Sequence, residues 1–137
     1  MIMNLTEQLK EHEGFRGVPY LCTSGKTTIG YGRNLDANPI TESEAELLLV
    51  NDIKNIQSAV KRAIKLDGHN GPRQAVIINM AFNIGITGLL RFKKMLSAFD
   101  KHLYSVAAHE MLNSKWARQV GARAEQLALQ MQSGEWS

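Results

Sequence analysis

The sequence has little that would cross-link the chain or place it in a membrane. Cys22 is the single cysteine among 137 residues, so no disulfide can form within the chain and no oxidising compartment is needed. The longest apolar runs, such as residues 47–50 and 75–78, are far too short to span a bilayer. The first residues lack the apolar core of a secretion signal. We therefore expect synthesis in a cytoplasm and no stable membrane association.

Charge of one sign is also scarce. Sixteen Lys and Arg residues stand against thirteen Asp and Glu, a net charge of +3. This mild excess suits a polyanionic partner such as nucleic acid, a membrane surface or an anionic cell wall, without choosing among them. The basic residues are scattered and not gathered on one aromatic-rich face, which argues against a nucleic-acid binder. The four histidines, at 12, 69, 102 and 109, show no metal-ligand spacing, so we expect no metal and no cofactor.

The first third of the chain changes from a helical pattern to a glycine-rich one. Apolar positions at helical spacing predict a helix over residues 3–12, which stops at Gly14. Residues 20–22 and 27–29 then flank a Ser-Gly turn and predict a β-hairpin. Residues 34–39 are expected to form a loop.

The remainder of the sequence is helical. Thr41 and Glu44 form a capping box that opens a long helix over about residues 42–66. The next apolar segment predicts a helix that is buried on most sides and is broken by Gly85 and Gly88. That helix covers roughly residues 72–83, and shorter helices are expected near residues 89–99, 103–113 and 120–132.

Together these elements predict an α+β protein, mostly helical, in a single domain over residues 1–137. We expect a small β-containing lobe at about 13–42 and a linking helix at about 42–66. The helical lobe would comprise about 67–137 together with the N-terminal helix 3–12. Two lobes joined by a long helix favour a cleft between them, where substrates usually bind.

Three polar residues stand out in the glycine-rich stretch. Glu13 ends the first helix, Cys22 follows on the hairpin, and Thr28 comes after five intervening residues. In a hairpin bent back over the helix end, the three side chains would meet on one wall of a cleft. A Glu there can act as a general acid if its surroundings keep it protonated. A Cys and a Thr opposite it would hold a water molecule.

This spacing resembles the signature of the bacteriophage-type lysozymes, or endolysins, of glycoside hydrolase family 24: Glu, eight residues, Asp or Cys, five residues, Thr. The similarity extends along the whole chain and includes Glu13-Gly14, Thr28-Ile29-Gly30-x-Gly32, Ile40-Thr41, Glu44-Ala45-Glu46, Asn79-Met80-x-Phe82-Asn83-x-Gly85, Ser114-Lys115-Trp116, Arg123-Ala124 and Gly134-x-Trp136. The resemblance implies a lysozyme-like fold with a small β-hairpin lobe and a helical lobe.

The resemblance also implies a reaction: hydrolysis of the β-1,4 bond between N-acetylmuramic acid and N-acetylglucosamine, with inversion at the anomeric carbon. Glu13 would protonate the leaving oxygen. Cys22 stands where many relatives have an Asp that activates or orients the attacking water, and Thr28 would hold that water. Arg123 matches the family arginine that pairs with the catalytic Glu. Substrate contacts are implied for Gly30, Asn34, Phe82 and Asn83.

The resemblance further implies a monomeric endolysin that acts on bacterial peptidoglycan. It would be made in the cytoplasm of the host bacterium and would reach the cell wall in the periplasm once a holin opens the inner membrane. No nucleic-acid partner is expected.

The role of Cys22 stays open between base, water-positioning group and nucleophile. An unperturbed thiol has a pKa of about 8.5, so only a few per cent is thiolate at pH 7. We therefore expect Cys22 mainly to position water. Two other functions also remain: a catalytically silent cell-wall-binding module that keeps the fold, and a lytic transglycosylase that leaves a 1,6-anhydro product.

Overall fold

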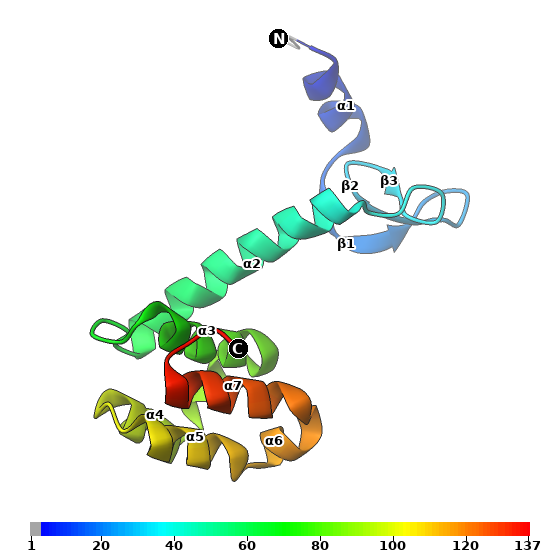
Figure 1. The fold of residues 1–137 in the computed structure, drawn as a ribbon. Coiled ribbons are helices and arrows are strands. Elements are labelled where there is room, and N and C mark those ends of the chain that lie inside the picture. The colour runs from blue at the N-terminus through cyan, green and yellow to red at the C-terminus, as the bar shows by residue number, and fades with distance from the viewer. Residues whose placement is uncertain (1–3) are drawn as a thin grey trace. The chain divides into compact units, whose positions relative to one another are not determined.

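The structure, a computed structural model, describes residues 4–137 and confirms a mostly helical α+β protein (Figure 1). The chain divides into two compact units, Met1–Leu48 and Leu49–Ser137, and the boundary falls inside helix α2 (Glu42–Ala63). The finer division into lobes, with the N-terminal helix assigned to the helical lobe, stays a prediction.

The first unit begins with α1 (Leu5–Glu13). The Asn4 side chain accepts a hydrogen bond from the backbone N–H of Glu7 at 2.9 Å and caps the helix. Gly14, with φ 69°, ends it in a conformation that glycine adopts without steric cost. The predicted first helical residue, Met3, lies outside the described residues.

A three-stranded antiparallel sheet follows α1, in the order β1-β2-β3. Its strands are β1 (Arg16–Leu21), β2 (Thr27–Gly30) and β3 (Arg33–Asn34). Tyr20 pairs with Thr28, so the predicted hairpin is confirmed. The short β3 was not predicted, and Asn34 was wrongly placed in a loop. A two-residue strand has no room for the alternating pattern that reveals longer strands.

Helix α2 starts at the predicted capping box. The backbone N–H of Thr41 donates to the Glu44 carboxylate at 2.8 Å, and the N–H of Glu44 donates back to the Thr41 hydroxyl at 3.2 Å. Glu44 also accepts two hydrogen bonds, at 2.8 and 2.9 Å, from the Arg33 guanidinium. This pair ties β3 to the start of α2. The helix ends at Ala63, three residues before the expected Leu66.

The second unit packs five further helices beside the rest of α2. They are α3 (Gly71–Leu90), α4 (Lys93–Asp100), α5 (Tyr104–Leu112), α6 (Lys115–Val120) and α7 (Ala122–Ser133). Helix α5 packs against α4 and α7, and α7 also contacts α3 and α6 (Figure 1). The largest fully buried side chains of its core are Val60, Val76, Ile77, Met80, Leu89, Met95, Phe99, Met111 and Met131.

The sequence located these helices more reliably than their ends. Gly85, with φ 79°, kinks α3 where a break was expected, but the helical run continues beyond it to Leu90. Helix α4 accordingly begins at Lys93 and not near residue 89. The short α6 was missed. It depends on the Ser114 hydroxyl, which accepts from the N–H of Ala117 at 3.1 Å.

Helix α3 is the one described helix whose length and mean hydropathy would suit a membrane span. The same composition suits a helix in a protein core. Five α3 residues are buried in the core of the second unit, and these are Val76, Ile77, Met80, Ala81 and Leu89.

Candidate active site

Glu13 is the last residue of α1, and its side chain is exposed. Its carboxylate lies directly against the backbone of Gly32: a Cβ atom on Gly32 would be 2.5 Å from Glu13 Oε2. Gly32 also has φ 73°, which a residue with a side chain rarely adopts. The sequence analysis included Gly32 in a motif without giving it a role. The structure gives it one, since only glycine leaves room for the carboxylate.

Cys22 and Thr28 lie together at the other end of β1. Cys22 follows the last residue of β1, and its backbone N–H donates to the carbonyl of Lys26 at 2.9 Å across the hairpin. Thr28 sits on the central strand β2, 3% exposed, and its hydroxyl donates to the same Lys26 carbonyl at 2.9 Å. Two of the three predicted catalytic residues therefore bond to the same carbonyl, Cys22 through its backbone and Thr28 through its side chain.

The hairpin turn makes the Cys22 thiol more acidic than usual. The Ser24 hydroxyl lies 3.2 Å from Cys22 Sγ, and this hydrogen bond is the largest cause of the change. Backbone N–H groups of Lys26 and Ser24 and the Thr28 hydroxyl act in the same direction, against a smaller opposing effect of burial. Together they lower the pKa of Cys22 from 9.0 to about 7. Hydrogen bonds favour the charged form, so no neighbouring cation is required.

The two predicted substrate contacts of the first unit lie on strand ends. Gly30 ends β2 with φ 68°, and a Cβ there would meet nothing within 4 Å. Its conformation, and not a close neighbour, selects glycine. Asn34 pairs with Thr28 in the sheet, and its side-chain oxygen accepts from the N–H groups of Asp36 and Ala37 at 3.0 and 3.2 Å. The Asn34 oxygen is thus used to fold the short loop, and its NH₂ group keeps two donors for a ligand.

The other predicted residues lie in the second unit. Phe82, 44% exposed, and Arg123 both line a pocket of about 470 Å³ whose walls are otherwise mainly apolar. Arg123 donates to the side-chain oxygen of Asn79 at 3.1 and 2.8 Å. The expected pair between Arg123 and Glu13 would join residues of different units and stays a prediction.

Asn83 lies outside that pocket and is fixed by an aromatic neighbour. Its side-chain oxygen accepts from the indole N–H of Trp116 at 2.7 Å. Trp116 is 6% exposed and packs edge-on against Phe92, with ring centroids 6.0 Å apart. The bond determines which end of the Asn83 amide faces the indole and leaves its NH₂ group as a donor for a ligand.

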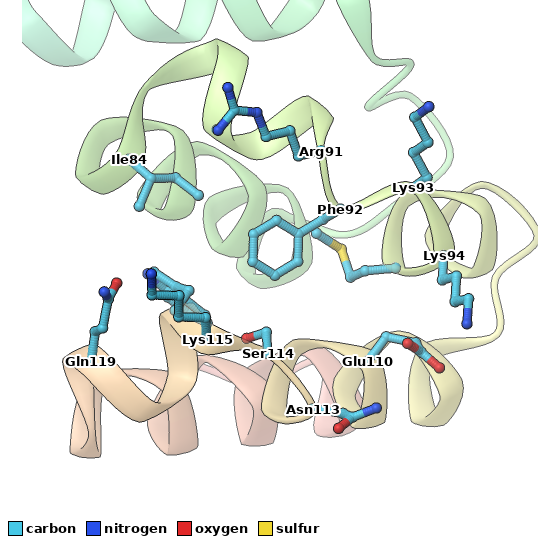
Figure 2. A pocket seen from close by; sticks show the side chains of 13 residues that line it. Ile84, Arg91, Phe92, Lys93, Lys94, Glu110, Asn113, Ser114, Lys115 and Gln119 are labelled. Atoms are coloured by element: carbon cyan, nitrogen blue, oxygen red, sulfur yellow. The ribbon is translucent and has the colours of Figure 1, made fainter.

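Trp116 and Phe92 form part of the wall of a larger pocket, of about 650 Å³, between α3, α4, α5 and α6 (Figure 2). Its walls are mainly apolar, and around them stand one carboxylate, on Glu110, and four cationic side chains, on Arg91, Lys93, Lys94 and Lys115. Three of these cations lie within residues 91–94, and the sequence analysis assigned them no role. Such a concentration of positive charge favours an anionic ligand. Within residues 4–137, no group of three or more His, Cys, Asp or Glu residues is positioned to hold a metal ion.

The chain is similar to known lysozymes and endolysins. A model of the phage lysozyme family matches residues 10–132. An endolysin of Acyrthosiphon pisum secondary endosymbiont phage 1 is 31% identical over 80% of this chain and 75% of its own length. The protein named Probable T4-type lysozyme 1 of Dictyostelium discoideum is 28% identical over 98% of this chain and 96% of its own.

A third relative is much longer. The pre-baseplate central spike protein of Enterobacteria phage T4 is 28% identical over 96% of this chain, which spans only 28% of that protein. The family match covers most of the chain, and the chain therefore belongs to the phage lysozyme family. Membership makes it a lysozyme-like peptidoglycan hydrolase, a glycosidase by class.

Proposed function

We propose that this protein is a muramidase that hydrolyses the β-1,4 bond between N-acetylmuramic acid and N-acetylglucosamine and acts as an endolysin in host lysis. The observation that carries the proposal is the arrangement on the small sheet. An exposed Glu13 carboxylate is seated on Gly32 at one end of β1, and an acidic thiol with a threonine lies at the other. The enzyme would be monomeric, made in the host cytoplasm and released to the wall through a holin.

In this mechanism Glu13 donates its proton to the leaving glycosidic oxygen. A water molecule held by Cys22 and Thr28 attacks the anomeric carbon from the opposite face, which inverts its configuration. Cys22 would act as a base as well as position the water. Its pKa of about 7 allows the thiolate to accept the proton that the water loses. Solvent then exchanges protons with both groups and restores the starting state. Arg123 would pair with Glu13 and bias its ionisation.

The second unit would bind the substrate around the reacting bond. Phe82 offers an exposed aromatic face, and the NH₂ group of Asn83 can donate to a sugar or peptide carbonyl. The basic pocket of Arg91, Lys93, Lys94 and Lys115 would hold carboxylates of peptide-substituted glycan. Gly30 and Asn34 would line the sugar path on the sheet.

The decisive test is digestion of purified peptidoglycan with mass analysis of the fragments. The native protein is expected to release hydrated muropeptides with reducing ends, and Glu13→Gln is expected to release none. Glu11→Gln is the matched control because it removes a neighbouring exposed carboxylate of α1. Anhydro fragments would instead indicate a lytic transglycosylase. Glycan that binds the native protein but stays intact would indicate a wall-binding module.

The stereochemistry of the product tests the proposed role of water. Proton NMR of the first-formed reducing end is expected to show the α-anomer, since inversion of a β-linkage gives it. Retention, or a covalent sugar adduct on Cys22 detected by mass, would instead make the thiol a nucleophile. Cys22→Asp is expected to keep activity, and Cys22→Ala to lose much of it while still binding glycan.

A further inference from the structure

A hydrogen-bonded cluster of two histidines and a tyrosine lies in the second unit, outside the candidate active site. His69 lies in the segment between α2 and α3, His102 in the turn between α4 and α5, and Tyr104 at the start of α5. The Tyr104 hydroxyl oxygen is 2.7 Å from Nδ1 of His69 and 2.7 Å from Nδ1 of His102. The two imidazole rings stack with their centroids 4.4 Å apart. One hydroxyl therefore bridges two segments that are distant in sequence.

Counting protons shows what this bridge requires. A tyrosine hydroxyl has one proton to donate, so one imidazole Nδ1 accepts that proton while the other Nδ1 donates its own N–H to the oxygen. In that arrangement at least one ring is neutral. If both rings are protonated, both Nδ1 atoms can still donate to the hydroxyl oxygen, but the hydroxyl proton then loses its acceptor within the cluster. Two positive charges then also lie on rings stacked 4.4 Å apart.

The surroundings oppose a second charge. His69 is 7% exposed and stacks on Phe99 at 3.7 Å. Burial is the largest cause that lowers the pKa of His69, followed by the neighbouring His102. Arg73 on α3 and Lys65 beyond the end of α2 lower that pKa further, and only Asp100 at the end of α4 raises it.

The bridge also holds a strained turn and connects to a third helix. His102 has φ 60°, a conformation that costs energy in any residue other than glycine. The Arg73 guanidinium lies 3.7 Å from the centre of the Tyr104 ring and donates to the backbone carbonyls of Met131 and Gln132 at 2.8 Å. The same cluster thus contacts the end of α7.

We propose that the His69–Tyr104–His102 bridge is a pH-sensitive latch, closed while at least one imidazole is neutral and open when both are charged. Opening releases the strained turn at His102 from the segment that carries His69. The direction of the pH dependence follows from the lowered pKa of His69, because the unfolded or open chain binds a proton at this residue more readily than the closed chain does. The latch therefore stabilises the second unit above pH 6.5, and this stabilisation is lost as the pH falls below that value.

NMR titration of the histidine ring protons, combined with amide hydrogen exchange, tests the latch. In the native protein we expect His69 to titrate below pH 6.5, in steps coupled to His102. Protection of the amides of residues 102–104 should fall by up to tenfold per pH unit between pH 6.5 and the step at which His69 titrates in the native protein, and should level off below that step. His12, on α1, provides an internal reference outside the cluster.

Two variants separate a latch from a merely structural cluster. Tyr104→Phe removes the bridging hydroxyl and should give low, pH-independent protection of the turn, while the direct charge interaction between the stacked rings remains. Tyr20→Phe is its control in the first unit. His102→Asn tolerates a positive φ and cannot titrate, so its turn should stay protected in acid. The proposal would be overturned if His69 and His102 titrate independently in the native protein and the His69 pKa is not lowered. It would also be overturned if the turn in His102→Asn opens in acid as much as it does in the native protein.

Discussion

The acidity of Cys22 gives the sharpest prediction because the chain holds no other thiol. A pKa of about 7 makes about half of the thiol ionised at pH 7, whereas the ordinary value of 9.0 would leave about one molecule in a hundred ionised. The gain in thiolate is therefore about fiftyfold. Nucleophilicity falls with pKa, by roughly eightfold over two pKa units. The net rate of alkylation at neutral pH should then be about sixfold above that of an unperturbed thiol.

The assay is the rate of iodoacetamide labelling against pH, followed by intact mass. The midpoint is expected near pH 7 in the native protein. Ser24→Ala removes the largest cause of the shift, so its midpoint should move towards 9.0. Thr23→Ala is the matched control, since it removes an adjacent exposed hydroxyl that is not among the causes. A native midpoint near 9, or an unchanged midpoint in Ser24→Ala, would refute the reasoning.

The same titration should appear in catalysis if the thiolate is the base. A base works in its deprotonated form, so kcat/KM should fall tenfold per pH unit below about pH 7. In Cys22→Asp this acid limb should move to lower pH, because an ordinary aspartate has a pKa of about 3.9. A limb that stays near pH 7 in that variant would belong to another group, and Cys22 would then act without exchanging a proton.

Three further predictions concern stability and the site. Gly32→Ala forces a side chain into a left-handed conformation, which costs about 1–2 kcal/mol, and thermal unfolding should show this loss of stability. The new side chain also displaces the Glu13 carboxylate, so peptidoglycan turnover should fall more than peptidoglycan binding. Asn83→Ala leaves the Trp116 indole N–H without its acceptor and should lower the free energy of unfolding in urea by about 1–3 kcal/mol. Asn83→Asp keeps an acceptor oxygen and should not. Equal stabilities of the two variants would contradict the role of the Trp116–Asn83 hydrogen bond. The pKa of Glu44 is lowered mainly by a backbone N–H at the start of α2, so the stabilisation from the Glu44 carboxylate is present above pH 4.5 and is lost in acid. Glu44→Gln should therefore flatten the fall in melting temperature below pH 4.5. An unchanged slope would assign the acid instability to another group.

The sequence predicted those features of the fold that local chemistry decides. The capping box of Thr41 and Glu44 and the hairpin of residues 20–22 with 27–29 both formed as expected, whereas the pairing of Tyr20 with Thr28 was not predicted. Each depends on residues close in the chain. The short β3 and α6 were missed because neither is long enough to show a hydrophobic period. Strand β3 is held by its pairing with β2, whereas the Ser114 cap of α6 is local and was overlooked.

In the candidate site, too, some features depend on local sequence and others on the folded structure. The spacing predicted that Glu13, Cys22 and Thr28 meet on one wall of a cleft, and this stays a prediction. The hairpin places Cys22 and Thr28 on the same Lys26 carbonyl. The acidity of Cys22 could not be predicted, since it results from hydrogen-bond geometry around Ser24. The basic pocket was missed although Arg91, Lys93 and Lys94 are near neighbours in the sequence, and only helix packing brings Lys115 to them.

The candidate catalytic residues and the basic pocket should respond differently to mutation. Glu13, Cys22 and Thr28 lie within sixteen consecutive residues that run from the end of α1 to β2, so their mutual geometry depends on the end of the helix, the strand register and the turn conformation. Changes there should alter kcat, since these groups act on the reacting bond. The cations of the basic pocket belong to the packed helices of the other unit and would contact remote parts of the substrate. Their loss should raise KM for peptide-bearing glycan more than for peptide-free glycan, in which only the lactyl carboxylates of N-acetylmuramic acid remain as anions.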